Sequence, residues 1–87
     1  KGSVSNVHKV KKGMAEAIEI IVDSSYQNLK GKLISDLRLD ENINIPALKR
    51  GESVLMAHSD TEIHDEDHLI VFYKDKEVID NFYNTFR

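Results

Sequence analysis

The sequence contains no cysteine, a single proline and only four glycines. Without cysteine the chain can form neither a disulfide nor a thiolate metal site, and it has no cysteine nucleophile. The glycines do not occur at the spacing of a phosphate-binding loop, G-x-G-x-x-G. The serines, Ser24, Ser25, Ser53 and Ser59 among them, lack the flanking residues of a nucleophile elbow. These absences predict a protein that is not an enzyme.

Long apolar runs and a strong excess of positive charge are also missing. No segment approaches the ~20 apolar residues that a membrane-spanning helix needs. The net charge is −3, which argues against binding to duplex nucleic acid. The lysines near the amino end, Lys1, Lys9, Lys11 and Lys12, are interpreted as a solvated linker rather than a phosphate-binding patch. The chain starts without methionine, which indicates a segment of a longer protein.

A chain of 87 residues is long enough for one small domain with a thin core, which a partner chain would help to stabilise. Alternating apolar residues predict strands, and apolar residues at helical spacing predict helices. Residues 1–13 are expected to be a linker or lead-in strand, and residues 14–87 to be the domain. The predicted strands are 15–23, 43–48, 53–58 and 68–74, the predicted helices are 31–39 and 76–86, and residues 24–29 are predicted to be a polar turn. Asp75 is placed to cap the second helix.

This order of elements has short connections, which suit hairpins rather than crossovers. The expected fold is therefore α+β, a small, mainly antiparallel sheet of four or five strands with two helices. Pro46 cannot donate to a ladder, so its strand should be an edge strand or be interrupted there. Ile43, Ile45 and Leu48 around it form either an exposed apolar edge used for pairing or simple core.

Histidines and carboxylates concentrate in one polar segment, at His58, Asp60, Glu62, His64, Asp65, Glu66, Asp67 and His68. Such residues can bind Zn²⁺ or another divalent ion. The four-residue spacing of His64 and His68 brings ligands together only on a helix, whereas this segment is predicted to be a loop and a strand. It is therefore interpreted as a solvated acidic turn, and no metal site is predicted.

Short motifs follow one another in order over residues 4–87. They are Val7-His8, Lys12-Gly13-Met14-Ala15-Glu16-Ala17-Ile18-Glu19, Gly31-Lys32, Ile34, Asp36-Leu37, Arg50-Gly51, Val54-Leu55-Met56-Ala57, Asp67-His68-Leu69-Ile70-Val71-Phe72, Asp75-Lys76, Phe82 and Phe86. The ordered set resembles the TrkA-C (RCK-C) domain family, the C-terminal regulatory domains of Trk-type potassium-uptake proteins. That family usually has glycine before the aspartate of the last strand. Glu66 stands there in this chain, so we expect the turn to have adjusted.

The resemblance implies a cytoplasmic domain that lies at the inner face of the membrane through its partner. It implies no cofactor in this domain, and NAD or ATP only in a nucleotide-binding domain that would precede it. It also implies a homodimer, a small anionic effector often held between two protomers, a potassium-transporting membrane subunit as partner, and no nucleic acid. The alternatives are a structural domain that pairs subunits without a ligand and, less favoured, a sensor of divalent metal.

Arg50 is the main candidate for ligand contact, because a guanidinium donates two hydrogen bonds at once to phosphate or carboxylate. In family members that bind nucleotide messengers, an arginine at the matching position is implicated. The alternative is a solvent-facing arginine at a hairpin turn. The other predicted ligand-binding residues are Asn44, Ile45, Pro46 and Leu48. A two-fold axis would bring Arg50 of each protomer toward a shared groove.

Overall fold

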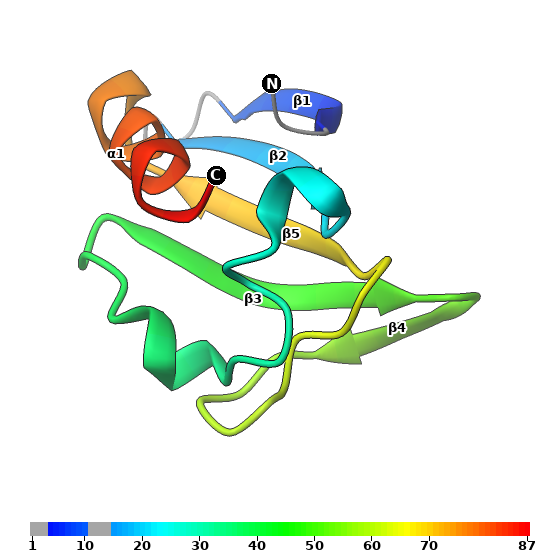
Figure 1. Cartoon of the computed structure of the whole chain (residues 1–87). Helices are drawn as coiled ribbons and strands as arrows, with labels where there is room; N and C mark the ends of the chain where they lie inside the picture. Colours follow the sequence, from blue (N-terminus) through cyan, green and yellow to red (C-terminus); the bar gives the residue numbers. More distant parts are fainter. Residues whose placement is uncertain (1–3, 11–14) are drawn as a thin grey trace.

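The computed structural model describes the backbone of residues 4–10 and residues 15–87 in full. The elements are β1 (Val4–Val10), β2 (Ala15–Ile21), two 3-10 turns (Ser24–Tyr26 and Ile34–Leu37), β3 (Ile43–Arg50), β4 (Ser53–Met56), β5 (His68–Tyr73) and α1 (Lys76–Phe86). The strands form one sheet in the order β1-β2-β5-β3-β4, with every neighbouring pair antiparallel (Figure 1). The α+β fold with a mainly antiparallel sheet is confirmed. Lys1, Lys11 and Lys12 of the amino-terminal lysine cluster lie outside the described residues.

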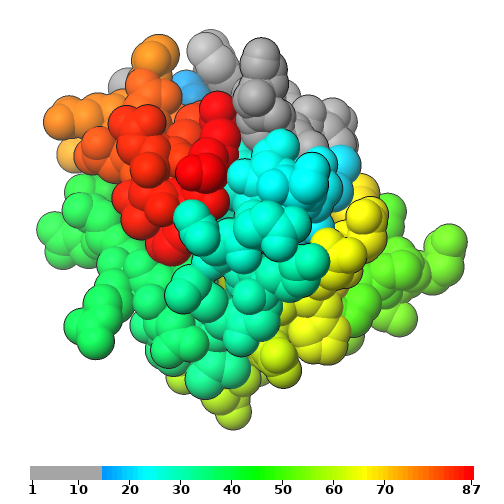
Figure 2. Space-filling model, viewed as in Figure 1, coloured from blue at the N-terminus to red at the C-terminus, as the bar shows by residue number. Residues whose placement is uncertain are grey.

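One face of the sheet carries the core beneath α1. Ile18 and Ile20 on β2 and Leu69 and Val71 on β5 face this side and are buried. Figure 2 shows α1 beside the segment around residues 24–30 on this face, and Arg87 Nε donates to the Tyr26 hydroxyl at 3.3 Å. The helix and the 3-10 turns therefore form a single layer over one side of the sheet.

The closing helix forms where its apolar stripe predicts it. The Asp75 carboxylate accepts a hydrogen bond from Val78 N at 3.1 Å, which satisfies one of the free amides of the first turn. Ile79, Phe82 and Phe86 are buried against the sheet. The rings of Phe82 and Phe86 lie 4.9 Å apart at 55°, a favourable tilted contact.

The two-turn helix predicted over residues 31–39 is absent, and only the 3-10 turn Ile34–Leu37 forms there. The backbone amides of Gly31, Ile34 and Ser35 donate to the carbonyls of Ile63, Thr61 and Ser59. These bonds to residues 59–63 replace the i to i−4 bonds that a helix would need. The segment ends at Arg38, whose φ of 49° is left-handed.

Pro46 interrupts its strand without making it an edge. β3 lies between β5 and β4, and its register with β5 shifts between Asn44 and Ala47, so the proline falls in an irregular stretch where the ladder is broken. Ile45 and Leu48 are buried, at 3% and 0% exposure, as is Ile43 at 6%. Of the two alternatives, these residues are core, and the exposed apolar edge is wrong. The edge strand on this side of the sheet is β4.

Glu66 has a φ of 69°, so the turn before β5 keeps the left-handed conformation and has not adjusted as expected. The turn is fixed because Glu66 N donates to Val22 O at 2.7 Å and Val22 N donates to Asp67 O at 2.8 Å. A side chain in this region of φ is strained relative to glycine.

Replacing Glu66 by glycine should therefore stabilise the fold by about 0.5–1 kcal/mol, since relief of strain outweighs the added freedom of the unfolded chain. Urea unfolding measures the change. Asp65→Gly is the matched control, because Asp65 has an ordinary φ and should lose stability. A Glu66→Gly variant as unstable as this control would contradict the strain argument.

Candidate functional site

Arg50, the main predicted ligand residue, is engaged with a buried carboxylate. Its Nε donates to Asp67 Oδ1 at 2.9 Å, and its Nη2 donates to Asp67 Oδ2 at 2.8 Å. The same Nη2 donates to the carbonyl of Glu62 at 2.9 Å, and His64 N donates to Asp67 Oδ2 at 2.8 Å. This arrangement, here named the Arg50–Asp67 clamp, joins the end of β3 to the loop before β5.

Asp67 is almost fully buried, at 1% exposure. Burial by itself would raise the pKa of its carboxyl group. The hydrogen bond and charge of Arg50, with the hydrogen bond from the His64 amide, outweigh burial and hold the pKa of Asp67 below its ordinary value. Asp67 is therefore ionised at neutral pH, and the guanidinium of Arg50 balances its buried negative charge.

About a third of the Arg50 side chain remains exposed. Within residues 15–87, no hydrogen bond from its Nη1 to another residue is found. An anion could therefore reach only the outer edge of the guanidinium, because Asp67 occupies the paired donors. Ligand binding by Arg50 stays a prediction.

Asn44 lies at the opposite end of β3 and borders a hollow of about 370 Å³. The residues that line the hollow come from the start of β2, from the start of β3 with the two residues before it, and from the end of β5 with the residue after it: Ala15, Glu41, Asn42, Ile43, Asn44, Phe72, Tyr73 and Lys74. Asn44 and Arg50 are six residues apart on an extended strand, about 20 Å at ~3.3 Å per residue. One small ligand cannot contact both residues within one chain.

The other predicted ligand residues expose little of their side chains to a ligand. Ile45 and Leu48 are buried in the core, and Pro46 is half-buried. Pro46 O accepts a hydrogen bond from Ala57 N at 2.9 Å. Of the five predicted residues, Asn44 and Arg50 thus expose functional groups, and the structure places them apart.

Sequence reasoning missed Phe72, Tyr73 and Lys74 as lining residues. They meet Asn44 because Ile43 pairs with Tyr73 and Asn44 pairs with Phe72 across β3 and β5. Burial, a hydrogen bond to Glu16 and nearby negative charge raise the pKa of Tyr73, so its phenol stays neutral. The hollow therefore combines apolar and aromatic side chains with two amide groups, the carboxylate of Glu41 and the cation of Lys74.

A second hollow, of about 220 Å³, lies between α1 and the segment that carries Leu37–Asp40. Ile43 lines both hollows, so they flank the same loop. Arg38 borders the second hollow, and it is exposed. Arg38, Asn44 and Lys74 therefore surround one end of the molecule, and Arg50 lies at the other.

The histidines of the polar segment turn to different partners. His64 Nε2 lies 3.8 Å from a Glu62 carboxylate oxygen, and His68 Nδ1 lies 2.5 Å from Glu19 Oε2 on β2. Over residues 15–87, no three histidines or carboxylates converge in a way that could hold a metal ion.

In the same part of the chain, no helix has the length and hydrophobicity to cross a membrane.

Comparison with protein families matches residues 17–87 to the family model described as the TrkA-C domain. Three curated relatives are each named Trk system potassium uptake protein TrkA. The protein from Halomonas elongata is 41% identical over 87% of this chain, that from Vibrio alginolyticus 36% over 91%, and that from Haemophilus influenzae 36% over 100%. This chain spans 17%, 18% and 19% of their respective lengths.

Among solved structures, an RCK domain with cda superposes with a TM-score of 0.65 at 20% identity. The match covers 82% of this chain and 97% of that one. It supports the fold on grounds independent of the sequence matches.

Proposed function

Because this chain belongs to the TrkA-C domain family, we propose that it is a regulatory domain of a bacterial potassium-uptake system, one that binds a small anionic effector and pairs with a second copy. The observation that carries the proposal is the family match over residues 17–87, together with relatives named for potassium uptake that match most or all of the chain. Under this proposal the domain performs no catalysis, and effector binding changes the behaviour of a transporter in another chain.

The longer protein would lie in the cytoplasm, at the inner face of the membrane through the transporting subunit. NAD or ATP would bind to a preceding nucleotide-binding domain and not to this one. The relatives are about five times as long as this chain, which leaves room for such a domain.

For the effector site, the geometry favours the Asn44 end of the molecule over the Arg50 end. Lys74 and Arg38 supply positive charge there, and the carboxylates of Glu41 and Asp40 border the same two hollows. Asn44 supplies an amide, and Phe72 supplies an aromatic face that is 39% exposed. Cations attract a phosphate or carboxylate, and an aromatic ring can stack on a planar group. Arg50 would contribute only if a second copy brought it to the same ligand.

We expect a nucleotide or cyclic dinucleotide to bind and Lys74→Ala to weaken that binding by about 1.5–3 kcal/mol, the usual worth of a charge-assisted hydrogen bond. Titration calorimetry of the 87-residue chain against nucleotides, cyclic dinucleotides and divalent ions measures it. Lys76→Ala is the matched control, because Lys76 pairs with Asp80 on α1 and does not line the hollow. Equal binding by the two variants would show that the effector binds outside this hollow. Binding of divalent ions alone would contradict the proposal that the effector is an anion.

A structural pairing domain without a ligand is the second candidate. It is favoured by the Arg50–Asp67 clamp, which gives Arg50 a role in the fold itself, and by the separation of Arg50 from Asn44. A chain that pairs but gives no heat with any of the probes would support it.

A further inference from the structure

The second hollow has an apolar floor and a charged rim. The floor is formed by side chains of α1 and of the loop that faces it, which are buried or partly buried in the core: Leu37, Leu39, Ile43, Val78, Phe82 and Phe86. The rim carries one cation, Arg38, one anion, Asp40, and one amide, Asn81, and all three residues are exposed. Figure 2 shows α1 and the segment around residues 38–43 side by side at the surface. A small ligand that enters from solvent can therefore place an apolar part on the floor and charged groups at the rim.

Arg38 is held in an unusual backbone conformation. Its φ of 49° is left-handed, a region in which a side chain is strained and glycine is not. Helical turns that end in this conformation usually have glycine there. A strained residue that the fold alone would replace by glycine indicates a function for its side chain.

The charged groups at the rim are available to a ligand. Arg38 N donates to Ser35 O at 3.4 Å, but within residues 15–87 the guanidinium of Arg38 forms no hydrogen bond or ion pair. Asp40 Oδ1 accepts a hydrogen bond from Asn42 N at 2.8 Å, which fixes the carboxylate. In the same part of the chain, no group donates to Asp40 Oδ2. The rim therefore presents one free guanidinium and one carboxylate oxygen, two residues apart in the sequence.

Opposite charges beside an apolar floor complement a free amino acid. The fork of Arg38 can donate two hydrogen bonds to an α-carboxylate, and Asp40 can accept from an α-ammonium group. A simple anion would be repelled by Asp40, and a simple cation would be repelled by Arg38. A zwitterion with an apolar side chain satisfies both charges and the floor at once.

The size of the hollow suits one side chain. Its volume is about 220 Å³. An apolar cavity of about 150 Å³ is enough to bind a benzene ring. A side chain the size of leucine or phenylalanine therefore fits, with its amino and carboxylate groups left at the rim.

We propose that the second hollow is a binding site for a free amino acid with a large apolar side chain. This site is additional to the anionic effector site proposed above and does not depend on it. The two hollows share Ile43, but their charged residues differ, being Glu41 and Lys74 in the first and Arg38 and Asp40 in the second.

Nuclear magnetic resonance titration of the ¹⁵N-labelled 87-residue chain with L-leucine and L-phenylalanine tests the proposal. At least one of them should bind with a dissociation constant below about 1 mM and shift the amide signals of residues 37–40 and 78–86. Three compounds each lack one part of the match: glycine lacks the side chain, leucinamide the carboxylate and 4-methylpentanoate the ammonium group. Each should bind at least about tenfold more weakly than L-leucine.

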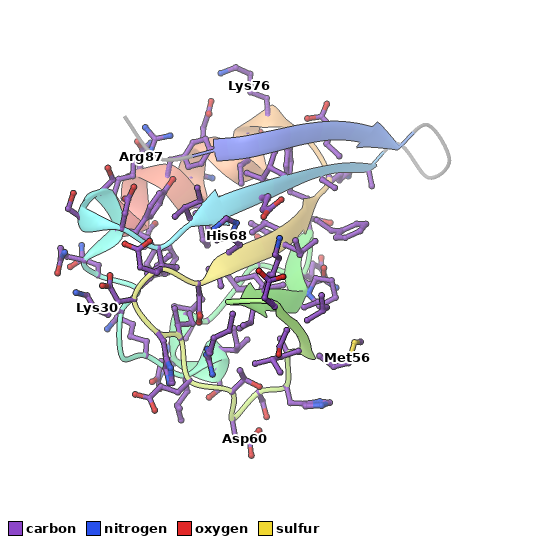
Figure 3. All side chains as sticks on the ribbon, turned by 90° about the vertical axis from the view of Figure 1, so that its right-hand side faces the viewer. Lys30, Met56, Asp60, His68, Lys76 and Arg87 are labelled. Atoms are coloured by element: carbon purple, nitrogen blue, oxygen red, sulfur yellow. The ribbon has the colours of Figure 1, made fainter. Side chains whose placement is uncertain are left out.

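Two variants test the rim. Arg38→Gly should weaken amino-acid binding at least about tenfold and yet melt no lower than wild type, because glycine relieves the strain. Asp40→Asn keeps an acceptor for Asn42 N and should weaken binding by a similar factor. The control is Lys76→Ala, which removes a cation from α1 outside the hollow and should bind as wild type does. Figure 3 shows the labelled Lys76 side chain extending away from the molecule.

Absence of binding by both amino acids at about 10 mM would overturn the proposal, as would equal binding by wild type and Arg38→Gly. If 4-methylpentanoate bound as tightly as L-leucine, the ligand class would be wrong, because Asp40 would not recognise an ammonium group. Signals that shift only around the first hollow would overturn the second hollow as the site. The titration with nucleotides and Lys74→Ala is a separate measurement, so failure of either proposal leaves the other standing.

Discussion

Replacing Arg50 by alanine is expected to lower the free energy of unfolding by about 3–5 kcal/mol at neutral pH, since it leaves a buried carboxylate without its cation. Asp67 is 1% exposed and cannot turn to solvent, and in the variant the His64 amide alone would still donate to it. A small domain has only about 5–15 kcal/mol in total, so the loss is a large fraction. Urea unfolding followed by circular dichroism measures it.

The matched variant is Asp67→Asn, which should cost less, about 1–3 kcal/mol. It leaves Arg50 without its counter-charge, but Arg50 still donates to the Glu62 carbonyl, and a third of its side chain already meets solvent. Lys49→Ala, an exposed cation on the same strand, should change stability by no more than about 0.5 kcal/mol. An Arg50→Ala variant no less stable than Lys49→Ala would show that the clamp contributes nothing to the fold.

The clamp also predicts how stability depends on pH. In the wild type the pKa of Asp67 is lowered on folding, so its contribution is present above the unfolded pKa and is lost as pH falls through the folded pKa. Without Arg50, burial would raise the pKa of Asp67 instead. The difference in the free energy of unfolding between wild type and Arg50→Ala should therefore be largest near neutral pH. It should begin to narrow above about pH 4, where Asp67 of the variant takes up a proton, and narrow further below that pH as the wild type loses its contribution. A difference that is constant with pH would contradict an ionised Asp67.

Phe82→Ala is expected to cost about 3–5 kcal/mol, because it removes a buried ring and leaves a cavity between α1 and the sheet. Phe82 is 4% exposed and is in contact with Phe86. The variant should melt at a much lower temperature or fail to fold. Differential scanning calorimetry measures the shift in melting temperature.

The control for this variant is Asn84→Ala, two residues along the same helix and exposed. It should change stability by no more than about 0.5 kcal/mol. If Phe82→Ala had the same melting temperature as Asn84→Ala, α1 would not be docked on the sheet through this ring.

The parts of the fold that could be predicted are those with a local signal. The stripe of α1 repeats at helical spacing, and Asp75 stands where a cap belongs, so sequence alone placed the helix. The segment 31–39 has a similar spacing, but its amides bond to residues 59–63, and no local pattern reveals such a partner. Tyr26 and Leu29 are buried in a segment predicted to be a polar turn, because single core residues in a loop have no periodicity.

The candidate site could likewise be predicted only where the signal lies in neighbouring residues. Arg50 was singled out for ligand contact, which stays a prediction. Its partner Asp67 is 17 residues away and was attributed only to the start of a strand. Asn44 and Arg50 were both predicted to bind the ligand, although they lie near opposite ends of one extended strand. Lys74 and Phe72 border the hollow through pairing of β3 with β5, which depends on the strand order and not on neighbouring residues.

The strand order has a consequence for how the chain folds. β5 is the last strand to be synthesised, yet it lies in the middle and is the sole link between the hairpin β1–β2 and the hairpin β3–β4. The two hairpins can form early from local contacts, but they cannot join until residues 68–73 insert between them, closing a loop of about fifty residues back to β2. Such non-local pairing slows folding. Until that insertion both hairpins expose unpaired edges, so the nascent domain is most open to aggregation just before its final strand arrives.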